Sequence, residues 1–193
     1  MFSHTGVPTI DGTPSGNQSL GTEFSLSIPA ALTGFWFFTP TGTANLPGTI
    51  AIYKVTGQSQ VAGTLVSSPT WSGAAGSQAW VKHTYSSPVT LAAGTNYRLS
   101  VFCSSSTAWA WLSTYWSSGA GSGGLVSGII SAPGTATASD SGAQVGNHTG
   151  ASLVYPGSNA STGANVWMDV EVTVASGGGP SGAVAALAAT GML

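Results

Sequence analysis

The chain has 193 residues but only eight charged side chains, which are 4% of its composition and give a net charge of −2. An ordinary soluble domain devotes about a quarter of its residues to Asp, Glu, Lys and Arg. Three cationic side chains are too few to neutralise the phosphates of a nucleic acid or to form a basic membrane-binding patch. We therefore expect no nucleic-acid partner, and the composition favours a protein of an assembly or of the cell exterior over a cytosolic enzyme.

The first 19 residues are predicted to form an N-terminal arm. They show neither the basic region nor the apolar region of a signal peptide. No stretch reaches the roughly 18 apolar residues of a membrane span. We therefore expect no membrane span and a location in a virion released by cell lysis, with an extracellular or cell-surface location as the alternative.

From residue 20 to residue 175 apolar residues recur with a period of two, which is typical of half-buried β-strands. The alternation is clearest at 24–28, 97–103 and 166–174. Further strands are predicted at 32–38, 49–55, 63–66, 79–85 and 108–112, with turn sequences rich in Gly, Pro and Thr between them. The pattern predicts an all-β protein, an antiparallel β-sandwich of the jelly-roll or immunoglobulin-like type.

The last strand is predicted to bury one face of five apolar residues. They are Val166, Met168, Val170, Val172 and Val174. Asp169 and Glu171 share the other face, which we interpret as solvent-exposed. Two alternatives remain for these two side chains: a Ca²⁺ site shared with Asp140 or with a backbone carbonyl, and a glycosidase carboxylate pair.

Four aromatic residues follow one another near the strand at 108–112. They are Trp109, Trp111, Tyr115 and Trp116. Trp109 and Trp111 share one strand face, and our first interpretation places the set in the core between the sheets. A subunit contact and a platform that stacks on sugar rings remain open for the same residues. The lone cysteine, Cys103, alternates with apolar strand residues and is predicted to be a buried thiol.

Two segments do not fit a compact sandwich. A Gly- and Ser-rich insertion at about 117–163 is longer than structureless loops usually are, and its scattered apolar residues predict partial order and packing against the sandwich or a neighbour. The segment 176–193 is a Gly-rich joint followed by an uncharged tail. Its apolar residues are predicted to contact a neighbouring subunit, and they are Val184, Leu187, Met192 and Leu193.

Three sequence blocks resemble the DUF4082 type of extracellular β-sandwich module. They are LGTEFSLSIPAALTGFWFFTPTG from Leu20, GTIAIYKVTGQSQVAGTLVSS from Gly48 and AWVKHTYSSPVTLAAGTNYRLSVF from Ala79. The third block is the most specific. The resemblance implies a sandwich module of surface and carbohydrate-active proteins with no catalytic residues, whereas the long insertion and the apolar tail depart from that pattern and point to assembly.

These features predict a non-catalytic structural protein of a virion, a capsid-decoration or tail-associated component of a tailed bacteriophage. Its partners would be other virion proteins or copies of itself. The alternative is a carbohydrate-binding module or adhesin that contacts a cell-surface glycan through the aromatic set. We expect no cofactor, metal or enzymatic activity, because the sequence lacks a G-x-S-x-G elbow and metal-ligand spacing of its three His residues.

Overall fold

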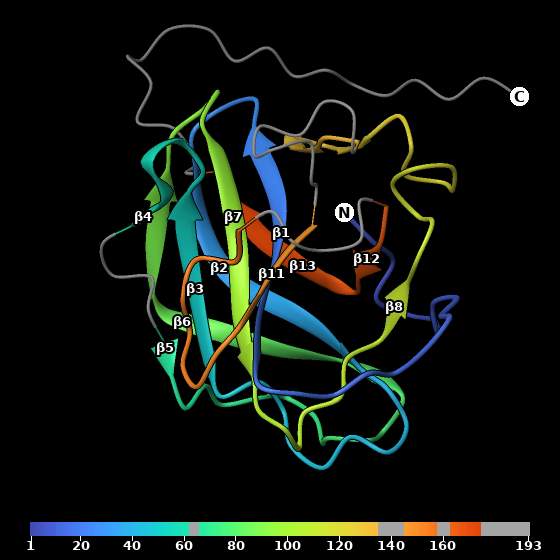
Figure 1. Ribbon diagram of the computed structural model, residues 1–193. Helices are drawn as coiled ribbons and strands as arrows, with labels where there is room; N and C mark the ends of the chain where they lie inside the picture. The colour runs from blue at the N-terminus through green and yellow to red at the C-terminus, as the bar shows by residue number, and fades with distance from the viewer. Residues whose placement is uncertain (62–65, 135–144, 158–162, 175–193) are drawn as a thin grey trace, which may run out of the picture.

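The computed structural model describes residues 1–61, 66–134, 145–157 and 163–174 (Figure 1). Apart from one 3₁₀ turn, η1 (Thr56–Gln58), the regular elements of these residues are β-strands. The strands are β1 (Gln18–Leu26), β2 (Ala30–Thr39), β3 (Thr49–Lys54), β4 (Ser59–Gln60), β5 (Val66–Ser67), β6 (Ala79–Leu91), β7 (Asn96–Cys103), β8 (Trp111–Leu112), β9 (Leu125–Ser127), β10 (Ile130–Ala132), β11 (Val145–Thr149), β12 (Asn165–Val166) and β13 (Met168–Thr173). No helix in this part of the chain is long and apolar enough to cross a membrane.

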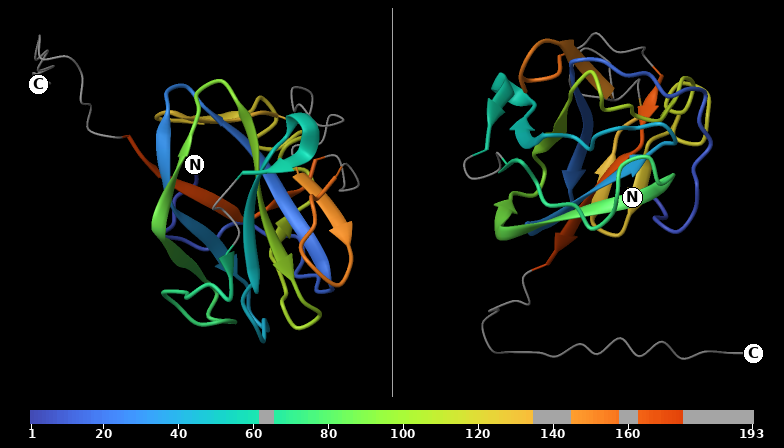
Figure 2. Two further views of the ribbon diagram at one scale, coloured as in Figure 1. Left: turned by 90° about the vertical axis from the view of Figure 1, so that its left-hand side faces the viewer. Right: turned by 90° about the horizontal axis from the view of Figure 1, so that it is seen from below.

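The strands form an antiparallel β-sandwich, which confirms the fold class predicted from the sequence. The larger sheet has the order β4-β3-β7-β1-β10-β9, with β5 added to β3 and β11 added to β1. The smaller sheet has the order β13-β2-β6, and β12 and β8 form a separate pair. Figure 2 shows the layers from two further sides.

The core lies between the two sheets, where the period-two pattern places the apolar residues. Phe24 and Leu26 of β1 belong to the same buried cluster as Phe35 and Phe37 of β2. Cys103 at the end of β7 is fully buried, as the sequence predicts. Burial raises the pKa of its thiol well above the usual range, so the thiol stays protonated and unreactive.

Strand β6 runs six residues beyond the predicted strand at 79–85 because it contains a bulge. Gly34 of β2 pairs with Thr84, but Leu32 pairs with Val89, so residues 85–88 lie opposite a single residue of β2. Pro88 falls in this bulge, where its missing N–H removes no ladder hydrogen bond. The turn that follows leads into β7 through Gly94, whose φ of 65° is easily reached only by glycine.

The insertion contributes strands to the sandwich, which confirms the predicted packing for its described part. Both β10 and β11 pair with the same edge of β1, β11 with its first half and β10 with its end. The apolar tail residues Val184, Leu187, Met192 and Leu193 lie outside the described residues. So does the predicted strand at 63–66, apart from Val66.

The predicted apolar face of the last strand is buried only in its first part. Val166, Met168 and Val170 are buried, but Val172 is half-buried and Val174 is 45% exposed. The reason is that β13 ends at Thr173, which pairs with Ala31 near the start of β2, so the sheet does not extend far enough to cover Val174. Ile28 is likewise 42% exposed, because β1 ends at Leu26.

Candidate functional site

The four aromatic residues singled out in the sequence come together beside the pair of strands β8 and β12. Trp109, Tyr115 and Trp116 are buried, whereas Trp111 is only half-buried. The Trp116 indole donates a hydrogen bond of 3.1 Å to the Asn165 side chain. Three of the four rings therefore lie in the core of this domain, in agreement with the first interpretation of the sequence.

Trp109 and Trp111 line a small cavity of about 220 Å³. Most of its other lining residues are apolar, and the polar ones are two amide side chains. The other lining residues are Pro14, Leu20, Val145, Ala164, Val166, Gln18 and Asn147. A cavity of this kind suits an apolar side chain from a partner, because its wall offers little hydrogen bonding and no charge.

Asp169 is fully buried, so the interpretation of its strand face as solvent-exposed is wrong. The N-terminal arm covers this face of the smaller sheet. The Asp169 carboxylate accepts hydrogen bonds from the Met1 α-amino group, from the Phe2 N–H at 2.7 Å and from His4 Nε2 at 3.1 Å. A buried carboxylate needs such partners, and the alternation of residues in one strand cannot reveal that a distant segment supplies them.

Aromatic contacts hold the rest of the arm against the same face. The Phe2 ring packs on Trp80 and meets the Trp167 ring edge-on with 5.0 Å between centroids. The His4 ring stacks on Trp36 at 4.3 Å. Trp80 packs against the core residue Phe38 on one side and donates a hydrogen bond to the Gly6 carbonyl of the arm. The arm thus packs on its own sandwich.

The arm also sets the charge state of Asp169. Burial alone would raise the pKa of this carboxyl, but the hydrogen bonds from His4, the N-terminal ammonium group and the Phe2 N–H outweigh it and lower the pKa below its ordinary value. Glu171 is partly exposed, and its pKa is also lowered, since the Lys82 ammonium at 2.6 Å and the Trp36 indole overcome the smaller desolvation there. The Asp169 carboxylate therefore holds the arm, and the Glu171 carboxylate holds Lys82 and Trp36.

A second buried charge pair lies on the outer face of the larger sheet, the face turned away from the core. Glu23 of β1 and Arg98 of β7 are opposite each other in the ladder, with 3.5 Å between Oε2 and Nη2, and both are 0% exposed. Arg98 Nη1 also donates a hydrogen bond of 2.8 Å to the Pro156 carbonyl. The guanidinium lies over the Tyr155 ring at 5.5 Å. The segment 145–157 therefore covers Arg98.

Two glycines allow segment 145–157 to pack closely over Arg98. Gly21 and Gly146 pair with each other across β1 and β11. A Cβ on Gly146 would come within 3.0 Å of the Pro156 carbonyl and Arg98 Nη1, closer than real Cβ atoms approach other atoms. The sequence shows these residues only as part of a Gly-rich chain, so the need for glycine at these positions is visible only in the structure.

We expect Gly146→Ala to destabilise the protein by about 1–3 kcal/mol or more, the usual cost of an added methyl group in a packed site. The clash involves backbone oxygen, which cannot move aside as a flexible side chain can. Gly157→Ala is the matched control, because a Cβ there meets nothing within 4 Å. Thermal melts of both variants check this expectation. Equal melting temperatures would show that segment 145–157 does not pack on Arg98 as described.

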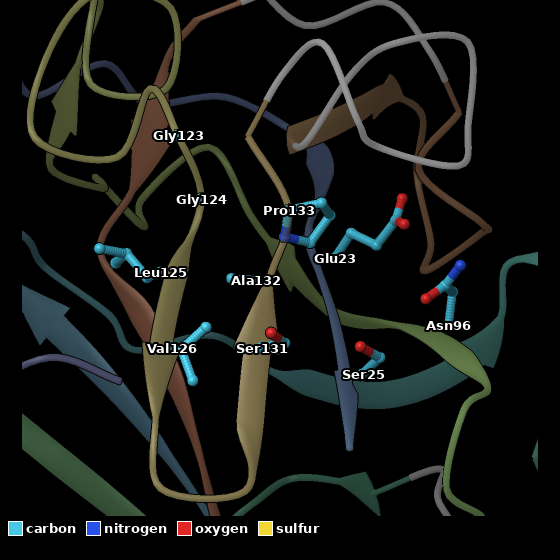
Figure 3. Close-up of a pocket in the computed structure, with 10 residues that line it drawn as sticks. All are labelled: Glu23, Ser25, Asn96, Gly123, Gly124, Leu125, Val126, Ser131, Ala132 and Pro133. Carbon is cyan, nitrogen blue, oxygen red and sulfur yellow. The ribbon is translucent and has the colours of Figure 1, made fainter. Parts of the chain in front are cut away.

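Beside the Glu23–Arg98 pair is an open cleft of about 310 Å³ (Figure 3). Ser25 of β1, Asn96 of β7 and Ser131 of β10 supply its accessible polar groups, and the fully buried Glu23 of β1 also borders it. The remaining lining residues come from the insertion and are small or apolar. They are Gly123, Gly124, Leu125, Val126, Ala132 and Pro133. No sequence pattern predicts this cleft, because its residues are brought together by strand pairing across distant segments.

No group of three or more His, Cys, Asp or Glu side chains in the described residues is arranged to hold a metal ion. Asp140, the third carboxylate of the Ca²⁺ alternative, lies outside those residues. Asp169 and Glu171 are engaged with the arm and with Lys82.

Comparison with known proteins gives no relative from which a role could be transferred. Neither a family model, nor a curated protein, nor a solved structure matches this chain. Its function must be argued from the surface and the cavities of the structure.

Proposed function

We propose that this chain is a non-catalytic structural protein of a virion, a capsid-decoration or tail-associated component of a tailed bacteriophage. The observation that carries the proposal is a molecular surface with very little charge. Of the charged side chains described, Glu23, Arg98 and Asp169 are fully buried, and only Asp11 and Lys54 are classed as exposed. Lys82 and Glu171 neutralise each other in a half-buried pair.

A surface of this kind suits permanent contact with other subunits. Charge repulsion is what usually keeps copies of a soluble protein apart, and here it is nearly absent. Isolated apolar side chains are exposed at Val7, Ile28, Val126 and Val174. Uncharged interfaces can be buried without the desolvation cost that ions incur.

Two features offer places for such contacts. The cavity beside Trp109 and Trp111 accepts an apolar side chain, and the uncharged tail carries four of them at Val184, Leu187, Met192 and Leu193. Burial of an apolar side chain contributes about 1.5–3 kcal/mol, and ordering a dozen residues costs a comparable amount. The tail would therefore add to the docking of the sandwich and would not replace it, and many copies would act together.

We also propose a relation to the DUF4082 type of module. The arrangement of the three resembling blocks supports it, because the first spans β1 and β2, the second spans β3 to β5, and the third spans β6 and β7. These blocks thus supply the central strands of both sheets, while the insertion adds to one edge of β1.

Deletion of residues 177–193 tests the proposed role of the tail. We expect the truncated protein to keep its fold and nearly the same melting temperature but to occupy fewer sites on the parent particle. Sedimentation of particles mixed with full-length and truncated protein measures the occupancy. A truncated protein that unfolds would place the tail in its own domain's core, and unchanged binding would remove the tail from the assembly contact.

A further inference from the structure

The cleft beside the Glu23–Arg98 pair has the chemistry of a small-molecule site (Figure 3). Its volume of about 310 Å³ falls in the range of ligand pockets. The polar groups that a ligand can reach are a primary amide and two hydroxyls, from Asn96, Ser25 and Ser131, whereas the Glu23 side chain that also borders the cleft is fully buried. Rigid strands hold these three groups, so the site is formed before a ligand arrives.

The strand register places these groups on one face of three adjacent strands. Ser25 pairs with Asn96 on one side and with Ser131 on the other. Directly paired residues in antiparallel strands have Cβ atoms about 4.5–5.5 Å apart. A ligand in the cleft therefore meets several hydrogen-bonding groups at once. A ligand with several hydroxyls can bond to more of these groups than a ligand with one.

The charges at the cleft favour a neutral ligand. The Arg98 guanidinium is 3.5 Å from the Glu23 carboxylate, so it compensates the one ionised group among the lining residues. Both charged side chains are fully buried and paired with each other, so neither a cationic nor an anionic ligand gains a counter-charge that would offset its own desolvation. The amide and hydroxyl side chains both donate and accept, which matches the hydroxyls of an uncharged molecule.

The remaining wall of the cleft is apolar. Leu125, Val126 and Pro133 line it, and the Val126 side chain is 78% exposed. The C–H face of a ligand ring can pack against such a wall while its hydroxyls hydrogen-bond to the polar side chains of the strands.

We propose that this cleft binds a neutral polyhydroxylated small molecule of the monosaccharide class. The proposal is independent of the proposed virion role, since it concerns a separate site and a separate measurement. It also differs from the glycan alternative drawn from the sequence, in which the Trp109–Trp116 aromatic set would supply the contact.

The test is a titration of the full-length protein, followed by amide chemical shifts in NMR. The probes are glucose, galactose and mannose, with glucuronate and glucosamine as charged counterparts. We expect at least one neutral sugar to shift the resonances of Ser25, Asn96 and Ser131, and both charged sugars to bind more weakly. Absence of saturable shifts with every neutral sugar, or equal binding of the charged ones, would overturn the proposal.

The variant S25A/S131A locates the binding. We expect a three- to tenfold weaker affinity, the effect of removing one or two hydrogen bonds. Ser67→Ala on the exposed end of β5 is the matched control and should leave affinity unchanged. Ser131→Ala alone replaces the double variant if the latter loses its native melting transition. Sugar binding that is unchanged in the cleft variant, or that shifts Trp111 instead, would assign the sugar to another site.

Discussion

Replacement of Arg98 by methionine is expected to destabilise the protein by about 3–5 kcal/mol, the usual cost of breaking a buried ion pair from one side. The substitution keeps a long side chain but leaves the Glu23 carboxylate buried opposite an apolar group, and it removes the hydrogen bond to the Pro156 carbonyl. For a protein of this size the melting temperature should fall by roughly 6–20 °C. Differential scanning calorimetry measures the change.

The double variant E23L/R98M separates the charge effect from packing. With both charges gone, no ion remains buried without a partner, and replacing a buried pair by apolar residues is often nearly neutral. We expect the double variant to melt closer to the native protein than Arg98→Met does. A single variant that melts within a degree or two of the native protein would show that the pair is not buried as described.

Asp169→Asn should release the N-terminal arm. The substitution removes the charge that the Met1 amino group, the Phe2 N–H and His4 share, and one hydrogen bond to a charged group is worth about 1.5–3 kcal/mol. Trp36, Trp80 and Trp167 lie under the arm, so their fluorescence should shift to longer wavelength. Lys54→Gln is the control, since Lys54 is exposed at the end of β3 in the other sheet.

The same variant should change the response of the protein to acid. Because the folded-state pKa of Asp169 is lowered, its contribution to stability is complete above the unfolded value of about 3.9 and is lost as the pH falls through the folded value. Thermal melts between about pH 5 and pH 2 should therefore fall less steeply for Asp169→Asn than for the native protein. Parallel curves, with unshifted fluorescence, would contradict the described contact between the arm and Asp169.

The sequence predicts the sandwich because the period of two reports a local property, the alternate burial of neighbouring residues. Phe24, Leu26, Met168 and Val170 lie where that pattern places them. The pattern fails at Asp169, because the partners that bury it lie 165 and more residues away in the arm. No local pattern carries such information.

The candidate sites also depend on contacts between distant segments, which a local sequence pattern does not report. The grouping of Trp109, Trp111, Tyr115 and Trp116 is visible in the sequence, but which of them remains open to a partner depends on the packing of β8 against β12. No sequence pattern predicts the cleft at Glu23, because Ser25 and Ser131 come together only through the pairing of β1 with β10. The Gly-rich insertion gave no strand pattern from which that pairing could be predicted.

We have proposed that this nearly uncharged sandwich is a structural part of a virion. The most direct measurement is quantitative mass spectrometry of purified particles produced from the genome that carries its gene, before and after a high-salt wash. We expect the chain to be present in many copies per particle and to remain after the wash, because contacts through an uncharged surface are not screened by salt. Absence of the chain from the particles, or its complete release by salt, would show that it is not a structural part of the virion.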